Sequence, residues 1–334
     1  MESPVTRPET VTKLRYAADA AFAMLAGMQL DVFTPLKGGP QRADEIARAI
    51  GVAPTRLRLV LYSLAAAGLL IEEHGRFSNT PEADQFLVKG GPSYIGDWHP
   101  TFSNRWVRNL KIAESIRAGA PTAKLDFAQS PQEELEKYFR RINQLTVAAA
   151  YALLEKYDFS STKTLADVGC GAAGIAVTVA KARPDIQATA IDIAQVAPIA
   201  QKIVDSEGVA DRVRVLAADV LSGPLPGEYD TVVLRAFLQV LSSENARLAL
   251  KNVAAAVKPL GTIYIIGHIL DDSRISPPEA LGFNLSLISQ FDSGESYTEQ
   301  EHRGWLSEAG FVDIGRANFM LADEHGVMTA RKRV

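Results

Sequence analysis

The sequence predicts an α/β protein in which a doubly wound, mainly parallel sheet follows a mostly helical N-terminal module. Three observations support this prediction. From residue 164 onward, strand-like apolar runs alternate with helical stretches. A glycine turn ends the first of these strands, and the N-terminal part of the chain reads as helices followed by a hairpin. With 334 residues, the chain is also long enough for two domains.

The alternation predicts strands near residues 164–169, 187–192, 212–217, 229–235 and 261–267, and helices near 174–183, 195–207 and 243–257. Such regular alternation is typical of a parallel sheet with helices on both faces. The segments HRGWLSEAGF, VDIGRANFML and HGVMTARKR predict a final helix and two strands that form an antiparallel hairpin at the sheet edge. Ligands of these sheets bind beyond the carboxyl ends of the strands, so we expect the functional residues there.

The N-terminal module predicts an apolar helix over residues 11–36, two helices over 43–50 and 54–69, and a hairpin in LLIEEHGRFSNT. This order is that of a winged helix, which suggests DNA binding or a ligand-responsive regulator. The second of the paired helices carries only Arg56 and Arg58 as basic residues, whereas a DNA-reading helix needs a basic stripe. We therefore expect no nucleic-acid partner and favour a dimerisation role for this apolar module.

The composition of the chain bears on its disulfides, its location and a membrane partner. The net charge is −4 and Cys170 is the single cysteine, so no disulfide can form within the chain, as expected in a reducing cytoplasm. No run of 18 apolar residues occurs, and the polar start MESPVTRPET shows no secretory signal, so we predict a cytoplasmic protein without a membrane partner. The first ten residues are predicted to be disordered, and residues 92–160 helical with breaks near 119–121 and 130–131.

The glycine turn in TLADVGCGAAG is compatible with two cofactors. Gly169, Gly171 and Gly174 match the dinucleotide fingerprint GxGxxG, and Asp192 follows at the end of the next strand. However, Asp167 precedes the first glycine, and a pyrophosphate beside a carboxylate is disfavoured because the two charges have the same sign. The chain has no Lys or Arg between Leu165 and Ala180 to offset that repulsion.

S-adenosylmethionine fits the same residues better, because it has no phosphate and carries a sulfonium and an ammonium group. A carboxylate at the turn is then favourable. Asp192 suits the ribose hydroxyls, and Asp219 follows the next apolar strand, where an adenine amino group is expected. Three strand ends with one acid each therefore favour S-adenosylmethionine over a dinucleotide.

A longer series of motifs resembles the class I methyltransferases. DVGCGAAG, AID, AAD, VVLRAFLQVLSSENARLAL and GESYTEQEHRGWLSEAGF occur in the order and spacing of that superfamily. Together with the N-terminal module, the chain over residues 11–334 resembles the small-molecule O-methyltransferases, which include caffeate and hydroxyindole enzymes and bacterial tailoring enzymes. The resemblance implies a Rossmann-like methyltransferase sheet and a homodimer formed through the N-terminal domain.

The resemblance also implies a division of the chain and a set of site residues. It places a winged-helix dimerisation domain at 11–95, a helical bridging region that lines the acceptor pocket at 96–160, and the S-adenosylmethionine-binding domain at 161–334. The cofactor-binding positions of the family fall on seven residues, which are Asp167, Gly169, Gly171, Asp192, Asp219, Val220 and Arg235. Ala173 stands where the family often has a third glycine, which is tolerable if the turn is not tight there.

The chain departs from the family at its general base. The family has a histidine in a segment resembling LKxxLHDWSDE, whereas Leu234 to Glu244 read LRAFLQVLSSE and Gln239 takes the histidine position. Glutamine does not accept a proton at pH 7. The family implies an oxygen acceptor on a small apolar or aromatic molecule. The missing histidine also leaves sulfur, nitrogen or carbon acceptors open, and likewise a member that binds the cofactor without methylating.

Two histidines are candidates for a replacement base. His268 follows the fifth strand, and His99 lies in the bridging region. The other three histidines, His74, His302 and His325, lie in polar segments that we expect to be exposed and inert. Cys170 is expected to be a small residue packed beneath the cofactor. We assign no metal site.

Overall fold

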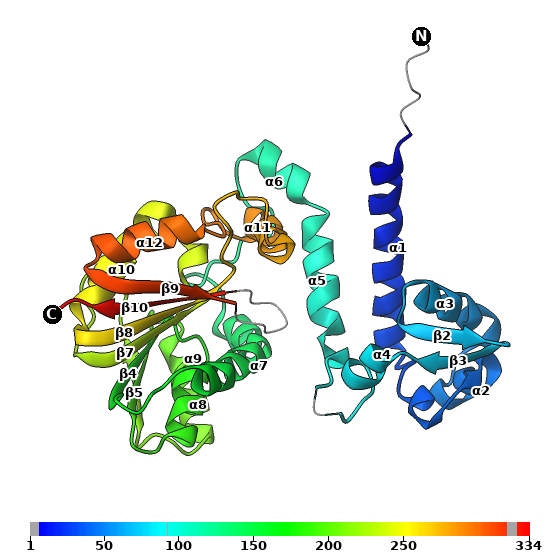
Figure 1. Cartoon of the computed structure of the whole chain (residues 1–334), viewed down its shortest axis with the longest axis horizontal. Coiled ribbons are helices and arrows are strands. Elements are labelled where there is room, and N and C mark those ends of the chain that lie inside the picture. The colour runs from blue at the N-terminus through cyan, green and yellow to red at the C-terminus, as the bar shows by residue number, and fades with distance from the viewer. Residues whose placement is uncertain (1–6, 92, 319–325) are drawn as a thin grey trace, which may run out of the picture. The chain divides into compact units, whose positions relative to one another are not determined.

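The computed structural model describes residues 7–91, 93–318 and 326–334. The chain folds into two compact units, Met1–Val107 and Arg108–Val334. The fold class is confirmed, since a helical N-terminal region precedes a mostly parallel sheet with an antiparallel edge (Figure 1). No helix in the described part of the chain is long and apolar enough to cross a membrane.

The first unit is mainly helical. Its helices are α1 (Glu9–Gln29), α2 (Ala43–Ile50), α3 (Pro54–Ala66), α4 (Pro81–Phe86) and the start of α5 (His99–Asn109), with 3₁₀ turns at Pro35–Gly38 and Gly96–Trp98. A small sheet has the strand order β1 (Gln41–Arg42), β3 (Arg76–Asn79), β2 (Leu70–Glu73). The predicted hairpin is confirmed by the antiparallel pairing of β2 with β3.

The predicted first helix is too long at its C-terminal end. It ends at Gln29 and not at residue 36, because Asp31 adopts a left-handed φ of 55° and Pro35 opens a 3₁₀ turn. A single left-handed residue stops an α-helix, and the Asp31 side chain stabilises the turn by accepting a hydrogen bond from the Thr34 hydroxyl at 2.5 Å. The prediction that the first ten residues are disordered is wrong for Glu9 and Thr10, which already belong to α1, and residues 1–6 lie outside the described residues.

The second unit contains the large sheet. Its strands are β4 (Thr164–Val168), β5 (Gln187–Asp192), β6 (Val213–Ala217), β7 (Tyr229–Arg235), β8 (Val257–Gly267), β9 (Phe311–Ala317) and β10 (Gly326–Lys332). Their order is β6-β5-β4-β7-β8-β10-β9. The five strands from β6 to β8 are parallel, and β10 pairs antiparallel with both β8 and β9. The predicted antiparallel edge hairpin is therefore confirmed.

Helices cover both faces of this sheet (Figure 1). The helices of this unit are α6 (Ile112–Ala118), α7 (Gln132–Lys156), α8 (Gly174–Ala182), α9 (Ala197–Ser206), α10 (Ser243–Ala255), α11 (Pro278–Gln290) and α12 (Glu299–Glu308), of which α6 and α11 pack against each other. Leu165 of β4 packs with α7, α8 and α9, whereas its neighbour Ala166 faces α10 and α12. The alternation follows from the pleat of a strand, which points successive side chains to opposite faces.

Helix α11 was not predicted, because two consecutive prolines, Pro277 and Pro278, stand at its start and Gly282 and two serines interrupt its apolar residues. The predicted strand VDIGRANFML runs only to Ala317 among the described residues, and its last residues, Phe319 to Leu321, lie outside them. The predicted break near residues 119–121 is confirmed by Gly119, which ends α6 in a left-handed conformation.

Candidate cofactor and acceptor site

Asp167 is the last residue but one of β4, the strand that leads through the glycine turn into helix α8. The side chain is buried, and its Oδ2 accepts a hydrogen bond from the Ala176 N–H in the first turn of α8 at 3.1 Å. A carboxylate at this position stabilises the helix because it pairs an otherwise free N–H and opposes the helix dipole. Burial raises the pKa of Asp167 to about 7, although the N–H bonds and Arg235 oppose that rise.

The glycine turn after Asp167 leaves no room for side chains. Gly169 and Gly171 have φ angles of 69° and 56°. A Cβ on Gly169 would lie 2.5 Å from the Phe237 ring, and one on Gly171 would lie 2.7 Å from the Phe139 ring. The turn is held by N–H bonds, from Gly169 to the Ile191 carbonyl at 2.9 Å and from Gly171 to Asp192 Oδ2 at 2.8 Å. Both glycines are therefore required by conformation and by space.

Ala173 and Cys170 complete the turn. Ala173 is buried and adopts a left-handed φ of 59°, so it lies in the tight part of the turn, where its methyl group adds about 1–2 kcal/mol of strain. Cys170 is buried as expected, and burial raises the pKa of its thiol well above the usual range. The thiol therefore stays protonated and is a packed small residue.

Two further carboxylates end the neighbouring strands. Asp192 ends β5, accepts an N–H bond from Ile193 at 2.9 Å, and has a pKa raised to about 6 by burial. Asp219 follows β6, is exposed, and accepts hydrogen bonds from the Leu221 N–H and the Ser222 hydroxyl at 2.9 Å each. A hydrogen bond from the Ala218 N–H to the Asp192 carbonyl at 2.9 Å brings these strand ends together.

Val220 and Arg235 lie at the same edge of the sheet. Val220 is buried, and its carbonyl accepts a hydrogen bond from the Asn252 side chain at 2.7 Å. Arg235 ends β7, and its Nη1 donates to the Thr146 hydroxyl of α7 at 3.0 Å. The sheet thus gathers all seven expected cofactor-binding positions at the carboxyl ends of β4, β5, β6 and β7.

These residues fit a cationic nucleoside and not a pyrophosphate. Asp167 already accepts a hydrogen bond from an N–H group at the N-terminus of α8, where a dinucleotide fold normally binds phosphate. The raised pKa values of Asp167 and Asp192 show that burial disfavours two nearby negative charges, which a sulfonium or ammonium group would stabilise. When bound, S-adenosylmethionine supplies an electrophilic methyl group at this edge.

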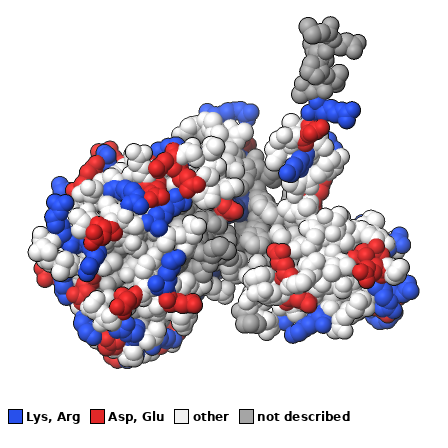
Figure 2. All heavy atoms as spheres, viewed as in Figure 1, with Lys and Arg blue, Asp and Glu red and all other residues white. Residues whose placement is uncertain are grey.

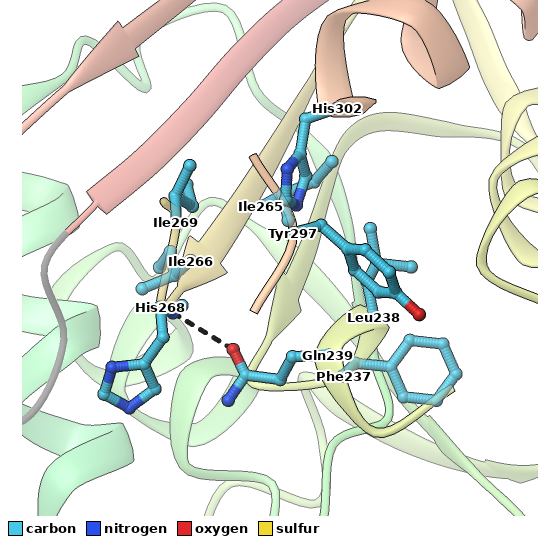
Figure 3. A pocket seen from close by; sticks show the side chains of 10 residues that line it. Phe237, Leu238, Gln239, Ile265, Ile266, His268, Ile269, Tyr297 and His302 are labelled. Atoms are coloured by element: carbon cyan, nitrogen blue, oxygen red, sulfur yellow. Dashed lines mark hydrogen bonds between the residues drawn. The ribbon is translucent and has the colours of Figure 1, made fainter. Parts of the chain in front are cut away.

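Gln239 lies in the 3₁₀ turn Leu238–Val240 after β7. Ala236 adopts a φ of 51° and turns the chain out of the sheet. The Gln239 side chain is 6% exposed, and its Oε1 accepts a hydrogen bond from the backbone N–H of His268 at 3.0 Å (Figure 3). Its Nε2 is buried and has no hydrogen-bond partner among the described residues. The residue at the family's histidine position thus bridges the ends of β7 and β8.

A small pocket opens around this amide (Figure 3). Its lining residues are Phe237, Leu238, Gln239, Ile265, Ile266, Gly267, His268, Ile269, Tyr297 and His302. The buried His268 ring stacks on Phe283 of α11, with the ring centroids 4.3 Å apart and the planes at 18°. The Tyr297 hydroxyl donates to the Leu241 carbonyl at 2.5 Å.

The expectation that His302 is exposed is wrong. It is 4% exposed, its Nδ1 lies 2.8 Å from the Thr298 carbonyl, and burial lowers its pKa, so the ring is neutral at pH 7. The sequence contained the signal, since His302, Trp305 and Leu306 have the spacing of one buried helix face. His74 is exposed as predicted, and His325 lies outside the described residues.

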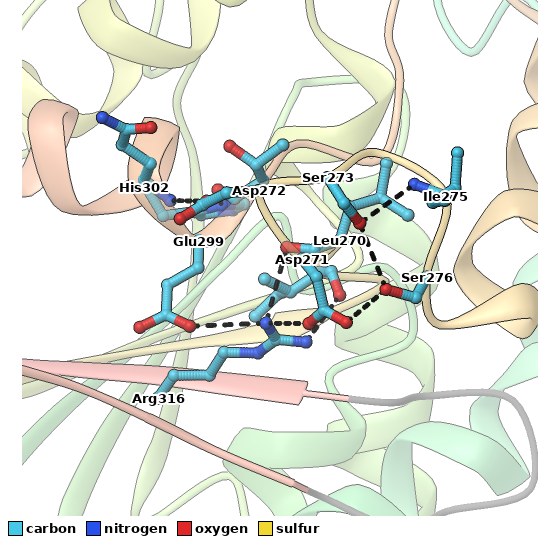
Figure 4. A network of polar contacts seen from close by, with 12 residues as sticks. Leu270, Asp271, Asp272, Ser273, Ile275, Ser276, Glu299, His302 and Arg316 are labelled. Atoms are coloured by element: carbon cyan, nitrogen blue, oxygen red, sulfur yellow. Dashed lines mark hydrogen bonds and ion pairs between the residues drawn. The ribbon is translucent and has the colours of Figure 1, made fainter.

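A polar network fixes the segment that follows His268 (Figure 4). Arg316 of β9 donates to Asp271 Oδ1 at 2.7 Å and to the Ile269 carbonyl at 3.0 Å, and it lies 3.4 Å from Glu299 of α12. The Ser276 hydroxyl donates to the other oxygen of Asp271 at 2.5 Å. The network ties residues 269–276 to the edge strand and to α12.

The three candidate catalytic residues are divided between the two units. His99 begins α5 and belongs to the first unit, whereas Gln239 and His268 belong to the second. Three residues that the sequence reasoning missed line the turn or the pocket, namely Thr146, Gly267 and Tyr297. The described residues contain no group of three or more His, Cys, Asp or Glu residues arranged to hold a metal ion.

Comparisons with known proteins agree with this site. The O-methyltransferase domain model matches residues 115–312, and the O-methyltransferase dimerisation domain model matches residues 16–89. The chain is 26% identical to 3-hydroxy-5-methyl-1-naphthoate 3-O-methyltransferase of Streptomyces sahachiroi, covering 97% of this chain and 95% of that protein.

Two solved structures show the same fold. One is the S-adenosylmethionine-dependent methyltransferase SibL in its apo form, with a TM-score of 0.82, 25% identity, and coverage of 98% of this chain and 100% of that one. The other is human N-acetylserotonin methyltransferase in complex with S-adenosylmethionine, with a TM-score of 0.75, 20% identity, and coverage of 99% and 100%. The domain match, the strand-end acids and the glycine turn establish that this chain belongs to the O-methyltransferase family and is an S-adenosylmethionine-dependent methyltransferase.

Proposed function

We propose that this enzyme methylates a hydroxyl oxygen on a small aromatic molecule. The observation that carries the proposal is the cluster of aromatic rings against the glycine turn. Phe139 touches the position a Gly171 side chain would occupy. Phe127 packs on Phe139, Tyr138 and Phe291 with centroid distances of 5.3, 5.7 and 6.0 Å. Rings arranged in this way favour a flat, apolar acceptor beside the methyl donor.

The proposed roles at the donor site follow from exposure and hydrogen bonding. Asp192 binds the ribose hydroxyls, Asp219 and Val220 contact the adenine, and the glycine turn passes close to the ligand. Asp219 suits a direct contact because it is exposed. Asp167 is buried and acts on a cation through its field. Arg235 orders this edge by joining β7 to α7.

In this proposal Gln239 replaces a base with a positioning contact. Methyl transfer is an in-line displacement, so alignment of acceptor and donor supplies much of the rate. His268 is the alternative base within the second unit, and His99 stays a candidate from the first. Sulfur, nitrogen and carbon acceptors are the runner-up class because they need less help from a base than an alcohol does. No comparison supports a member that binds the cofactor without methylating.

The proposal is tested in two steps. Calorimetry with S-adenosylhomocysteine measures the donor site, and we expect binding at one site per chain. Product analysis by mass spectrometry over matched phenols, thiols and amines then measures the acceptor. Methylated phenols support the proposal. Exclusive methylation of thiols or amines would overturn the choice of oxygen, and a failure to bind S-adenosylhomocysteine would overturn the donor site.

We further propose that residues 11–95 form a winged-helix dimerisation domain, that residues 96–160 are a bridging region lining the acceptor pocket, and that residues 161–334 bind the donor. The apolar residues Val11, Leu14 and Phe22 of α1 are between 56% and 68% exposed, as expected of a face that a second copy covers. Sedimentation should therefore give a homodimer, and Leu14→Glu should shift it toward the monomer.

The charge pattern supports a small-molecule acceptor over a nucleic-acid or membrane partner. On the face of the second unit visible in Figure 2, acidic and basic side chains are interspersed and no basic stripe forms. The single cysteine, Cys170, is buried and free, which fits a cytoplasmic location. Retention on DNA that falls with salt would contradict this part of the proposal.

A further inference from the structure

Gln239 lines the small pocket at the ends of β7 and β8, and one of its groups, the amide nitrogen, has no partner among the described residues. Its Oε1 faces the backbone N–H of His268 at 3.0 Å. A backbone N–H only donates, so the oxygen of the amide must be the atom that faces it. This contact fixes the amide orientation and leaves Nε2, with its two N–H bonds, without a partner among the described residues.

The packing around Gln239 depends on this orientation. A Cβ on Gly267 would lie 2.5 Å from Gln239 Oε1, so the absence of a side chain at Gly267 lets the amide approach β8. The Gln239 side chain is only 6% exposed, and its Nε2 has no partner among the described residues. Because a buried donor without a partner is unfavourable, an acceptor atom supplied by a ligand would be bound strongly there.

The surroundings of the amide contain no competing charge. The pocket lining within the described residues includes no Asp, Glu, Lys or Arg. The titratable groups that line it are His268 at the end of β8, Tyr297, and His302 of α12, whose pKa is lowered by burial. No carboxylate of this lining therefore repels a negatively charged oxygen, and a hydrogen bond from Nε2 to such an oxygen is shorter and stronger than one to a neutral hydroxyl.

We propose that Gln239 is a specificity-determining residue that selects acceptors arriving as oxyanions, namely phenols or enols acidic enough to ionise near neutral pH. This inference rests on the proposed function. The acceptor loses its proton to water before the reaction. The oxyanion then forms the new bond to the methyl carbon, the carbon–sulfur bond breaks, and its electron pair stays on sulfur. No protein group takes up a proton in that step, which agrees with a glutamine at the family's histidine position.

A spectroscopic titration tests the inference without methyl transfer. The protein is saturated with S-adenosylhomocysteine and titrated with 4-nitrophenol, whose ionised form absorbs visible light. A hydrogen bond from Nε2 favours the charged form, so the bound phenol should ionise about one pH unit lower than the free phenol. An unshifted or upward-shifted titration would overturn the proposal.

Four variants locate the cause of the shift. Gln239→Leu keeps the side-chain size and removes the donor, so the shift should disappear. Gly267→Ala should also abolish it, because the added methyl displaces the amide. His268→Ala keeps the backbone N–H that anchors Gln239, so the shift should persist, and its loss would assign the effect to the ring. Gln201→Leu, on the exposed surface of α9, is the matched control and should behave as wild type.

Turnover provides a second, separate result. With phenols of similar shape, the wild-type kcat/KM should fall roughly tenfold or more for weakly acidic members, and Gln239→His should restore them by supplying a base. Equal rates across the series would contradict selection of the oxyanion while leaving the proposed function intact. If S-adenosylhomocysteine binds but neither acidic nor neutral phenols bind or react, the aromatic acceptor of the proposed function fails, and the inference fails with it.

Discussion

The turns that follow β4 and β7 lie on adjacent strands of one sheet but are built differently. In the first, backbone N–H groups bond to Ile191 and Asp192, and a carboxylate satisfies an N–H at the helix start. In the second, the Gln239 side chain accepts a hydrogen bond from the end of the next strand, and its Nε2 has no partner among the described residues. The donor site is therefore set before any ligand arrives, whereas the acceptor site has a hydrogen-bonding group for a ligand to satisfy.

The largest expected effect tests how rigid the first turn is. Gly169→Ala combines a left-handed φ with a contact of 2.5 Å to Phe237. We expect the free energy of unfolding to fall by about 2–4 kcal/mol and the affinity for S-adenosylhomocysteine to fall at least about tenfold. Chemical denaturation and calorimetry measure the two effects.

Gly208→Ala is the matched control, because its φ is 69° but no atom lies within 4 Å of the added methyl. Its free energy of unfolding should fall by about 1 kcal/mol from backbone strain alone, and its affinity for S-adenosylhomocysteine should stay unchanged. Equal losses in the two variants would show that the approach of Phe237 is unimportant.

A smaller effect is expected on the acceptor side. Arg316→Ala removes the contacts to Asp271 and Ile269 that fix the segment after His268. Its side chain is 12% exposed, but Asp271 is about half exposed, so we expect a loss of about 2 kcal/mol in stability. Acceptor KM should rise while donor affinity stays unchanged. Arg247→Ala, from an exposed pair, should leave both unchanged.

The pH dependence of donor binding sharpens the same contrast. Asp167 and Asp192 have pKa values raised to about 7 and about 6, and a cationic ligand needs both ionised. Affinity for S-adenosylmethionine should therefore be about twentyfold weaker at pH 6 than at pH 8. S-adenosylhomocysteine is the control because its sulfur carries no charge. Its affinity should therefore change less between pH 6 and pH 8 than that of S-adenosylmethionine. Equal slopes would contradict an electrostatic role for the carboxyls.

The folding stability of the ligand-free protein should change with pH in the direction opposite to the donor affinity. A carboxyl whose pKa is raised on folding favours the folded state only while it is protonated. That contribution declines as pH rises from the unfolded value of 3.8 toward 7. Donor binding should consequently raise the melting temperature more at pH 8 than at pH 6, which thermal denaturation measures.

The smallest effect is expected at Ala173. Ala173→Gly relieves left-handed strain of about 1–2 kcal/mol, but it loses a buried methyl group and adds freedom to the unfolded chain. The net change in stability should stay within about 1 kcal/mol, with unchanged donor affinity. A larger loss would show that the methyl group is part of the packing that fixes the turn.

The sequence predicted the donor side well because its signals are local. The apolar strands β4 and β5 carry Asp167 and Asp192 at or next to their ends, and glycines follow shortly after Asp167. This combination of apolar, acidic and glycine residues predicts a strand and a tight turn from a few neighbouring residues alone. Where local signals were weak or overridden, the predictions were wrong or absent. Asp31 ended a helix that its apolar neighbours would have extended, and the prolines and glycine of α11 concealed a helix that packing stabilises.

The acceptor side was only partly predictable because it depends on contacts between distant segments. The substitution at Gln239 was visible, but its anchor on His268 and the space provided by Gly267 come from a different strand. His302 was judged by its polar neighbours in sequence, whereas the helix turns it inward with Trp305 and Leu306. Only the three-dimensional pairing shows that the amide oxygen of Gln239 is hydrogen-bonded while its nitrogen has no partner among the described residues.

Asp167 has one more consequence, which concerns the other adenosine compounds that share the cell with the donor. The buried side chain of Asp167 already accepts the hydrogen bond of the Ala176 N–H at the start of α8, which a phosphate would otherwise accept. A phosphorylated nucleotide would have to displace the Asp167 carboxylate from this N–H group and bring a second negative charge next to it. We therefore expect the residue that stabilises the turn also to disfavour phosphorylated nucleotides.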